Sequence, residues 1–268
     1  MQNIDTTRVA DIIRQVAQTE IMPRFKNLKQ SDIREKNPGD LVTVADEAAE
    51  KALTRMLQEA LPGALVVGEE AVSADPSVLE RLKDDKPVWI IDPVDGTTNF
   101  SKGSEKFGVL VALVQNGVTQ YGWAFDAAGD RMAIAQKGAG AFMNGEKIFV
   151  ACDAGEMSDL VIQYDGAPAS HVAAVRPLFR DMRRQGCCLH DHMDFLTGAV
   201  NSVVYFDRVT PWDHAAVNLL TQEAGGYVAL DEGAPCDPTR YGRAFMLAAP
   251  DKDRWQKLHA VFYPLRFA

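Results

Sequence analysis

The sequence predicts two kinds of architecture in one chain, an α+β first half and an α/β second half. In the first half, apolar runs follow one another between residues 107 and 143, and Asn116-Gly117 separates two of them, which is typical of an antiparallel hairpin. In the second half, strand-like and helix-like segments alternate, which favours helices packed on a sheet. The chain of 268 residues can bury a substantial core. We expect one compact unit with parts at 1–150 and 151–268.

The first part begins with two predicted helices. Residues 5–25 have apolar side chains at helical spacing, and Thr6 or Thr7 can cap the start of this helix. Thr43 is the expected N-cap of the second helix, with Asp46 in the capping-box position three residues later. The other elements expected in this part are a strand at 64–68, a short helix at 76–83, a strand at 87–91, and strands at 107–114, 118–125, 131–136 and 139–143.

The second part is expected to alternate between strands and helices. Its predicted helices lie at 171–183, 191–200, 212–224 and 251–262. Its predicted strands lie at 159–164, near 187, and at 202–206, 226–230 and 244–248. A small basic cluster, Arg180, Arg183 and Arg184, is interpreted as a solvated helix face.

Composition limits the classes of function. The formal net charge of −9 disfavours nonspecific nucleic-acid binding, which requires a basic surface. Residues 1–5 lack the pattern of a signal peptide, and the longest apolar stretch, 107–114, is too short to span a bilayer. A cytoplasmic protein without a nucleic-acid or membrane partner is predicted. The four cysteines form no C-x-x-C pair, and the adjacent pair is expected in a strand or the core: Cys152, Cys187, Cys188 and Cys236.

The segment around Pro93 is the most informative part of the chain. An apolar run, 88–91, predicts a short buried strand, and Pro93 is expected to end it because proline lacks a backbone donor. Asp92 and Asp95 bracket this proline on a stiff turn, with Asp92 expected at a solvent-facing strand end. Two carboxylates on a rigid turn suit Mg²⁺, which prefers oxygen ligands and bridges to substrate phosphate.

The residues that follow Asp95 complete a pattern for phosphate. If a helix or turn starts there, the amides of Gly96, Thr97 and Thr98 can face an anion. A divalent cation beside such amides is the arrangement used for phosphoryl chemistry. Simpler interpretations remain open for two acids. Asp46 is also suited to capping alone, and Asp213 to capping a helix that begins at Trp212.

Several motifs together resemble those of the inositol monophosphatase family, a group of Mg²⁺-dependent, lithium-sensitive phosphatases. The string Asp-Pro-Val-Asp-Gly-Thr-Thr-Asn-Phe at 92–100 resembles the family's signature. Stretches at 40–46, 68–70 and 211–226 resemble its other motifs, in the family's order. The resemblance runs from about Lys36 to Gly226. It implies a layered αβαβα sandwich, an active site where the two halves meet, and a homodimer.

The resemblance also implies a ligand set and a mechanism by metal-activated water. It assigns the first Mg²⁺ to Glu69, Asp92 and the Val94 carbonyl, and the second to Asp92, Asp95 and Asp213, with a third, weaker ion possible near Glu69. It assigns the catalytic water to Thr97, Asp46 and Glu69. Phosphate would be received by the amides of Gly96 and Thr97, beside Asp95 and Asp213. Glu70 is expected to be solvated or behind the ligands, and Lys36 is expected at the surface.

The substrate side of the resemblance is less complete. The family's sugar-recognising glutamate lies seven residues before the motif aspartate, and that position here is Phe206. Asp207 is its neighbour, and Ala199 belongs to a turn that resembles the family's substrate-side turn. The ring of Phe206 therefore predicts an apolar wall and a poor fit for inositol phosphate. Histidinol phosphate, a sugar phosphate and a nucleotide 3′-phosphate are alternative substrates.

Two alternatives to a Mg²⁺-dependent phosphatase are a zinc site and a non-enzymatic role. His190, His192 and His214 suggest a zinc site, but residues two apart seldom share a helix face and no cysteine has suitable spacing. A structural or solvent-facing role is predicted for these histidines. A non-enzymatic partner of the transcription or RNA machinery is the alternative from another class, and the acidic balance does not favour it.

Overall fold

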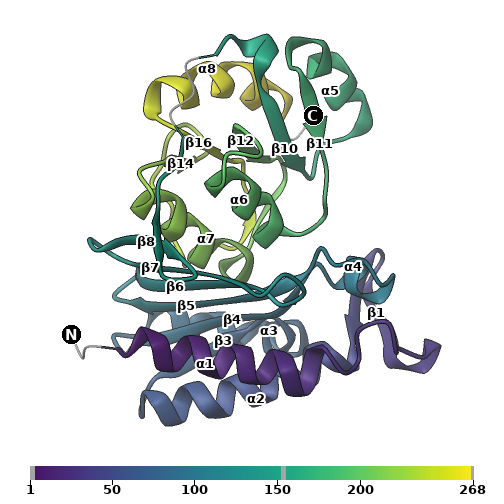
Figure 1. The fold of residues 1–268 in the computed structure, drawn as a ribbon, viewed down its shortest axis with the longest axis vertical. Helices are drawn as coiled ribbons and strands as arrows, with labels where there is room; N and C mark the ends of the chain where they lie inside the picture. Colours follow the sequence, from purple (N-terminus) through teal and green to yellow (C-terminus); the bar gives the residue numbers. More distant parts are fainter. Residues whose placement is uncertain (1–3, 152–154, 267–268) are drawn as a thin grey trace.

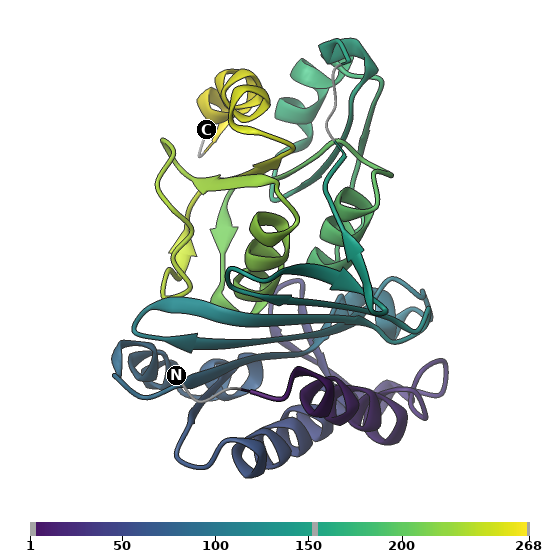
Figure 2. The ribbon, with the colours of Figure 1, turned by 60° about the vertical axis from the view of Figure 1, so that its left-hand side comes forward.

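The computed structural model describes residues 4–151 and 155–266; Cys152 lies outside them. Figure 1 shows helices and sheets stacked in alternating layers, with α1 and α2 below a large sheet, α6 and α7 between two sheets, and α5 and α8 on the far side. The turned view in Figure 2 shows the same order. The expected αβαβα sandwich is confirmed.

The first layer packs two helices on the large sheet. Helix α1, Thr6–Val16, continues into a π-helical turn, Ala17–Ile21, and α2 spans Val44–Ala60. The N-cap of α1 is Asp5, whose carboxylate accepts from the amides of Thr7 and Arg8, so the expected threonine cap is wrong. The expected cap of α2 by Thr43 is confirmed.

The large sheet has seven strands in chain order, and its neighbours are antiparallel except for the parallel first pair. Its strands are β3 Leu65–Gly68, β4 Val88–Asp95, β5 Gly108–Gln115, β6 Val118–Asp126, β7 Arg131–Gln136, β8 Gly140–Met143 and β9 Glu146–Ile148. The expected hairpin at Asn116-Gly117 joins β5 to β6.

Strand β4 does not end at Pro93, contrary to the expectation. It continues to Asp95, with Asp92 opposite Leu110 and Asp95 opposite Gly108. The register therefore shifts between the two aspartates, and Pro93 lies inside this irregularity. A proline is tolerated there because a bulge leaves a residue without a ladder hydrogen bond.

Several short elements surround the end of β4. A hairpin precedes α2, in a segment where no strand was predicted: β1 Ile33–Asn37 and β2 Asp40–Thr43. The others are the helices α3 Glu69–Ala74 and α4 Thr97–Ser101 and the 3₁₀ segments Gln30–Asp32 and Pro76–Lys83.

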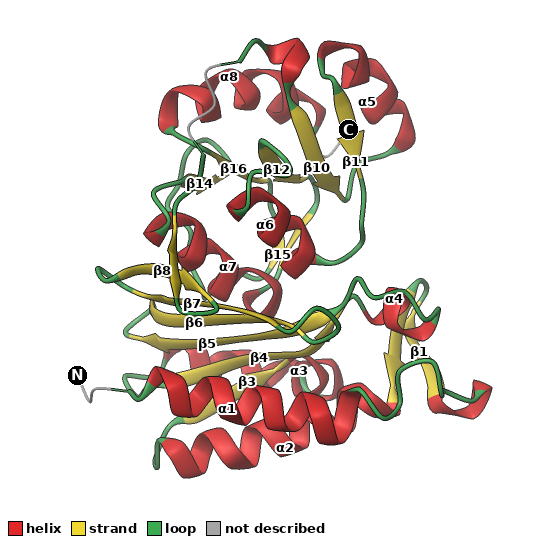
Figure 3. Cartoon of the chain, in the orientation of Figure 1, coloured by secondary structure: helices red, strands yellow, loops and turns green. Residues whose placement is uncertain are grey.

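The second sheet has five strands in the order β11-β10-β12-β16-β14. They are β10 Val161–Asp165, β11 Asp181–Arg183, β12 Ser202–Tyr205, β14 Tyr227–Leu230 and β16 Met246–Ala249. The helices are α5 Ala169–Val175, α6 Cys188–Leu196, α7 Pro211–Glu223 and α8 Lys252–Phe262 (Figure 3). A separate pair joins β13 Arg208–Val209 to β15 Gly242–Arg243, and 3₁₀ turns lie at Met157–Asp159, Arg176–Leu178 and Tyr263–Leu265.

The predicted helix over 171–183 is wrong. Pro177 cannot donate a helical hydrogen bond, and α5 ends two residues before it. The chain then pairs in parallel with β10 as β11, so Arg183 lies on a strand rather than on a solvated helix face. The strand expected near 187 is also wrong, because α6 begins at Cys188.

Three apolar clusters hold the layers together. The first joins α1 and α2 to the large sheet, the second lies between the two sheets around α6 and α7, and the third joins α5 and α8 to the second sheet. Strand alternation assigns residues to these clusters: Trp89 belongs to the first, and its neighbour Ile90 to the second. Both faces of both sheets are therefore covered.

The chain boundary near residue 150 remains a proposal, supported by the fact that each large sheet takes its strands from one side of it. Within the described residues, no helix combines the length and apolar character needed to cross a membrane.

Candidate metal and phosphate site

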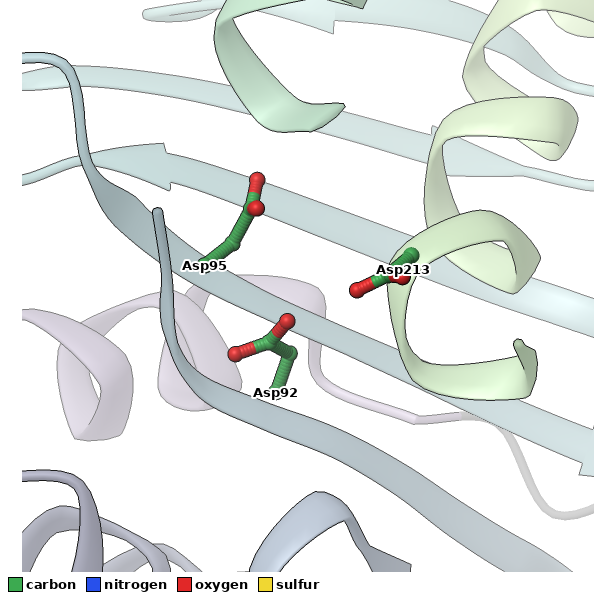
Figure 4. Close-up of side chains that lie close together, drawn as sticks. All are labelled: Asp92, Asp95 and Asp213. Atoms are coloured by element: carbon green, nitrogen blue, oxygen red, sulfur yellow. The ribbon is translucent and has the colours of Figure 1, made fainter. Parts of the chain in front are cut away.

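Three aspartates from distant parts of the chain converge between the two sheets. Asp92 and Asp95 come from the irregular end of β4, and Asp213 comes from the first turn of α7 (Figure 4). One carboxylate oxygen of each lies within 4.8 Å of the others. Asp92 is only 1% exposed, so the expectation of a solvent-facing strand end is wrong.

Each aspartate is held by its own hydrogen bonds. Asp92 Oδ1 accepts from the Val94 amide at 3.1 Å. The Asp95 carboxylate accepts from the amides of Cys188 at 3.1 Å and Leu189 at 2.5 Å, at the start of α6. A helix N-terminus stabilises a carboxylate because its free amides point outward.

Asp213 is fixed from the start of α7. Its Oδ2 accepts from the Thr210 hydroxyl at 2.5 Å, and Thr210 is the N-cap position of this helix. Asp213 lies in the first turn but is not the N-cap residue, so capping alone does not explain it. Pro211 occupies the first helical position, where a missing amide costs no hydrogen bond. The start of α7 is therefore rigid.

Burial and the repulsion of neighbouring acids oppose ionisation of Asp92 and Asp95. Burial, together with Glu69, Asp95 and Asp213, raises the pKa of Asp92 well above its usual range. Burial and then Asp213 raise the pKa of Asp95 to about 7, although the α6 amides act against the shift. Like charges this close favour the neutral form unless a cation compensates them.

Glu69 lies in the first turn of α3 at the end of β3, and its carboxylate is tied to Lys36. The Lys36 ammonium contacts Glu69 Oε1 at 2.8 Å and Glu70 Oε1 at 3.0 Å. Burial raises the pKa of Glu69 to about 8, although Lys36 acts against the shift. Lys36 has only 10% of its side chain exposed, so the expected surface position is wrong.

Behind α3 lies a further acid that the sequence analysis did not single out. Glu50 accepts from the amides of Glu70 at 2.7 Å and Ala71 at 2.9 Å. A Cβ added to Gly68 would lie 2.3 Å from the Glu50 carboxyl carbon, so a larger residue there would displace the Glu50 carboxylate from these amides. Glu50 follows Asp46 by one helical turn of α2, on the side that carries Leu53 and Leu57. A carboxylate on this apolar side of the helix is the feature of the sequence that could have predicted a buried acid.

Thr97 and Asp46 are in direct contact. The Thr97 hydroxyl lies 2.9 Å from Asp46 Oδ1 and 2.9 Å from the Val94 carbonyl oxygen. A hydroxyl has one proton, so it donates to only one of these acceptors at a time. The other carboxylate oxygen, Asp46 Oδ2, accepts from the amide and hydroxyl of Thr43, so Asp46 caps α2 and also reaches Thr97.

Gly96 turns the chain from β4 into α4. Its φ of +84° is left-handed, and an added Cβ would lie 2.7 Å from the Lys106 carbonyl oxygen. A side chain is excluded on both grounds. The turn places Thr97 two residues after Asp95, the last residue of β4.

A cavity of about 280 Å³ reaches this group of acids. Glu69, Asp95 and Asp213 line it on one part of its wall. Gly186, Cys187, Cys188, Tyr205, Arg208 and Trp212 are among the residues that line the rest. Cys187 and Cys188 are both buried, as expected of core residues.

The substrate side differs from the expectation. Tyr205 lines the cavity, and by strand alternation the ring of Phe206 turns to the other face of the second sheet. That ring packs against Phe245 and Phe262 in the third cluster, so an apolar wall made by Phe206 is wrong even though the residue borders the cavity.

Asp207 and Ala199 do not line this cavity. The Asp207 carboxylate pairs with Arg243 at 2.9 Å. Ala199 is exposed after the end of α6, and the turn that does border the cavity is Gly186-Cys187-Cys188 at the other end of that helix. The spacing of residues in the sequence could not show which end of α6 borders the cavity.

The histidines serve packing rather than a shared site. His192 Nδ1 lies 3.2 Å from the Thr221 hydroxyl, His214 Nδ1 lies near the backbone of Thr210, and His190 Nε2 lies near the Phe107 carbonyl. All three rings are buried. Among the described residues, the only cluster with metal-ligand spacing is the aspartate group.

Known proteins resemble this chain along most of its length. A model described as the inositol monophosphatase family matches residues 3–263. Inositol monophosphatase 1 of Sus scrofa is 31% identical over 241 residues, which cover 86% of this chain and 82% of that protein. Inositol-1-monophosphatase of Bacillus subtilis is 30% identical over 207 residues, which cover 74% of this chain and 76% of that protein.

A solved structure agrees with the sequence comparisons. The IMPase of Thermotoga maritima matches with a TM-score of 0.81 and 25% identity, covering 95% of each chain. The family match spans both sheets and every residue of the acidic group. The chain therefore belongs to the inositol monophosphatase family and is a phosphatase that hydrolyses phosphate monoesters.

Proposed function

We propose that the protein hydrolyses a small-molecule phosphate monoester with the help of two or three Mg²⁺ ions. The observation that carries this proposal is the convergence of Asp92, Asp95 and Asp213 within 4.8 Å. Three carboxylates, of which Asp92 and Asp95 are buried and Asp213 is half-buried, repel one another, and a cation relieves that repulsion. The donor atoms are hard oxygens, which suit Mg²⁺ better than thiophilic metals.

The ligand roles follow the geometry and the family. Glu69, Asp92 and the Val94 carbonyl would hold one ion, and Asp92, Asp95 and Asp213 would hold another, so that Asp92 would serve both. When bound, the ions would compensate charge on the phosphoryl oxygens and lower the pKa of the attacking water. Glu69 lines the cavity, and this position supports its proposed role as a metal ligand.

Thr97 and Asp46 would position the proton of the attacking water. If the Val94 carbonyl held a cation, the Thr97 hydroxyl would donate to Asp46 Oδ1, and the Thr97 oxygen would be free to accept a hydrogen bond from the attacking water. Glu69, which lines the cavity, would accept the proton. The amides of Gly96 and Thr97 would receive the phosphate.

The substrate class is supported at two levels. A cavity of about 280 Å³ suits a small metabolite. The named relatives act on inositol monophosphate, and that ester is one candidate substrate here. Histidinol phosphate, sugar phosphates and nucleotide 3′-phosphates remain alternatives. Because Phe206 faces the core, its ring gives no reason to disfavour inositol phosphate.

A homodimer and a cytoplasmic location are further proposals. The homodimer is taken from the family resemblance, and the location from the composition.

Phosphate release from these four classes of ester, in Mg²⁺ and in EDTA, tests the proposal. We expect release that requires Mg²⁺ and that millimolar lithium inhibits, as the family resemblance implies. Release that continues unchanged in EDTA would contradict the metal requirement. Release indifferent to lithium would contradict the inferred arrangement of ions.

A further inference from the structure

The cavity has a second charged region, which none of the proposed metal ligands contributes. Asp165 ends β10, Arg208 begins β13, and both line the cavity. The two segments are adjacent because the Phe206 amide donates to the Asp165 carbonyl oxygen at 3.1 Å. A phosphoryl group held at the aspartates would leave the rest of the ester facing this region, which we call the outer wall.

The charges on the outer wall do not cancel. Asp165 Oδ1 pairs with Arg184 Nε at 2.7 Å, and the neighbouring Asp207 pairs with Arg243 at 2.9 Å. Within residues 4–151 and 155–266, no carboxylate forms an ion pair with Arg208. Both acids are therefore compensated, and one cavity-lining guanidinium carries a charge without a protein partner.

This balance favours one kind of leaving group. A guanidinium offers only donors, and its planar fork matches the two oxygens of a carboxylate or phosphate. Recognition of a neutral polyol would instead use a free carboxylate as acceptor, and both acids near the outer wall are engaged by arginines. Charge-assisted hydrogen bonds are about twice as strong as neutral ones.

We propose that Arg208 determines specificity by binding a second anionic group on the leaving part of the substrate. The preferred substrates are then phosphate esters that also carry a carboxylate or another phosphate. This inference rests on the proposed phosphatase function. It predicts discrimination against the neutral analogue of the same size and shape.

Matched pairs of esters test the proposal. Glycerol 2-phosphate and 2-phosphoglycerate differ by one hydroxymethyl group replaced by a carboxylate, and so do sorbitol 6-phosphate and 6-phosphogluconate. Fructose 1-phosphate and fructose 1,6-bisphosphate form a third pair, in which the anionic group is a second phosphate instead of a carboxylate. In Mg²⁺, we expect kcat/KM to favour the anionic member of at least one pair on the order of 10-fold. The pair that responds distinguishes a carboxylate from a phosphate.

Variants assign the preference to one side chain. Arg208→Gln should bring the ratio of kcat/KM within the responding pair close to one, mainly by raising KM for the anionic ester. Arg208→Lys should retain part of the preference. Arg180→Gln is the matched control, because Arg180 is exposed, is not among the cavity-lining residues and changes the net charge equally.

The outcomes distinguish failure of the Arg208 proposal from failure of the proposed phosphatase function. Mg²⁺-dependent hydrolysis of the neutral esters, with ratios near one in all three pairs, would overturn the role of Arg208 alone. A preference that survives Arg208→Gln, or that Arg180→Gln removes equally, would also overturn it. Failure of the wild type to hydrolyse any of the six esters, while it hydrolyses inositol phosphate, histidinol phosphate or a nucleotide 3′-phosphate, would overturn the role of Arg208 alone. Failure with all of these esters would overturn both proposals.

Discussion

At the scale of single residues, the contact between Thr97 and Asp46 makes the sharpest prediction about turnover. Thr97→Ala and Asp46→Asn should each lower kcat by about 10²–10⁴-fold, because they position a proton rather than hold the cations. The double variant should be far less impaired than the product of the two effects, because the hydroxyl and carboxylate are 2.9 Å apart and act as one unit. Steady-state kcat at saturating Mg²⁺ measures this.

Asp46 also caps α2, so a control must separate the two roles. Thr43→Ala removes the hydroxyl that donates to Asp46 Oδ2 and should cost about 1 kcal/mol of stability with little effect on kcat. Thr97→Ser keeps a hydroxyl and should retain most of the turnover. Independent, multiplicative losses in Thr97→Ala and Asp46→Asn would count against the shared role.

Residue identity could be predicted where a motif is local. Asp92 and Asp95 flank one proline, and their convergence follows from the chain itself, although their burial does not. Lys36 and the amide of Leu189 approach the acids only through the tertiary fold. No pattern near Asp95 indicates that α6 begins against it. Phe206 was misplaced because counting residues does not reveal the face of a sheet.

At the scale of elements, His192 links the packing of α6 on α7 to pH. Its ring is buried, contacts Thr221 of α7, and stacks on Tyr205. Burial and then His214 lower the pKa of His192 to about 3, below its ordinary 6.5. A lowered pKa contributes stability that is present above pH 6.5 and is lost as the pH falls toward 3, by at most about 1.4 kcal/mol per pH unit.

Urea unfolding of wild type and His192→Asn from pH 8 to pH 4, in saturating Mg²⁺, measures this dependence. The variant should be less stable at pH 8, because it loses ring packing, but should lose less free energy of unfolding on acidification. The two curves should therefore approach each other below pH 6.5. Parallel curves over the whole range would show that His192 does not titrate differently in the folded protein.

Element prediction failed where proline had two possible effects. Pro93 was expected to end a strand, yet it lies within a register shift and β4 continues. Pro177 lies inside an apolar period that fits a helix, yet it ends α5 and the chain pairs as β11. In each case the local sequence fits both the predicted and the observed structure. Pairing of β4 with β5 decides the outcome at Pro93, and pairing of β11 with β10 decides it after Pro177.

At the scale of the whole molecule, the acidic site should destabilise the protein when no cation is bound. Burial raises the pKa of Glu69 to about 8 and of Asp95 to about 7, above their ordinary 4.5 and 3.8. A raised pKa contributes stability that is full below about pH 4 and is lost as the pH rises through 7 to 8. Wild type in EDTA should therefore unfold more easily at pH 8 than at pH 6.

Asp92→Asn tests this interpretation, because it removes one buried charge and keeps an oxygen to accept from the Val94 amide. In EDTA at pH 8, the variant should be more stable than wild type in urea unfolding. Added Mg²⁺ should stabilise wild type more than the variant. A variant that is less stable than wild type in EDTA would show that repulsion among these acids is not the dominant effect.

The layered fold could be anticipated only in part from the residues themselves. Alternating apolar segments indicated the two classes of structure, and the family resemblance supplied the sandwich. The order of strands and the burial of β3 to β6 between two helix layers depend on contacts between distant segments, and a local pattern does not specify them. The hairpin of β1 and β2 carries mainly polar residues, so no apolar alternation marked it.

Turnover of Asp92→Asn as a function of Mg²⁺ concentration tests the central claim most directly. The control is Asp126→Asn, which changes a buried carboxylate that pairs with Arg131 and does not line the cavity. We predict that wild type and Asp126→Asn release phosphate in a saturable, Mg²⁺-dependent manner, while folded Asp92→Asn retains only a trace of activity at any Mg²⁺ concentration. Substantial Mg²⁺-dependent turnover by Asp92→Asn would contradict the account.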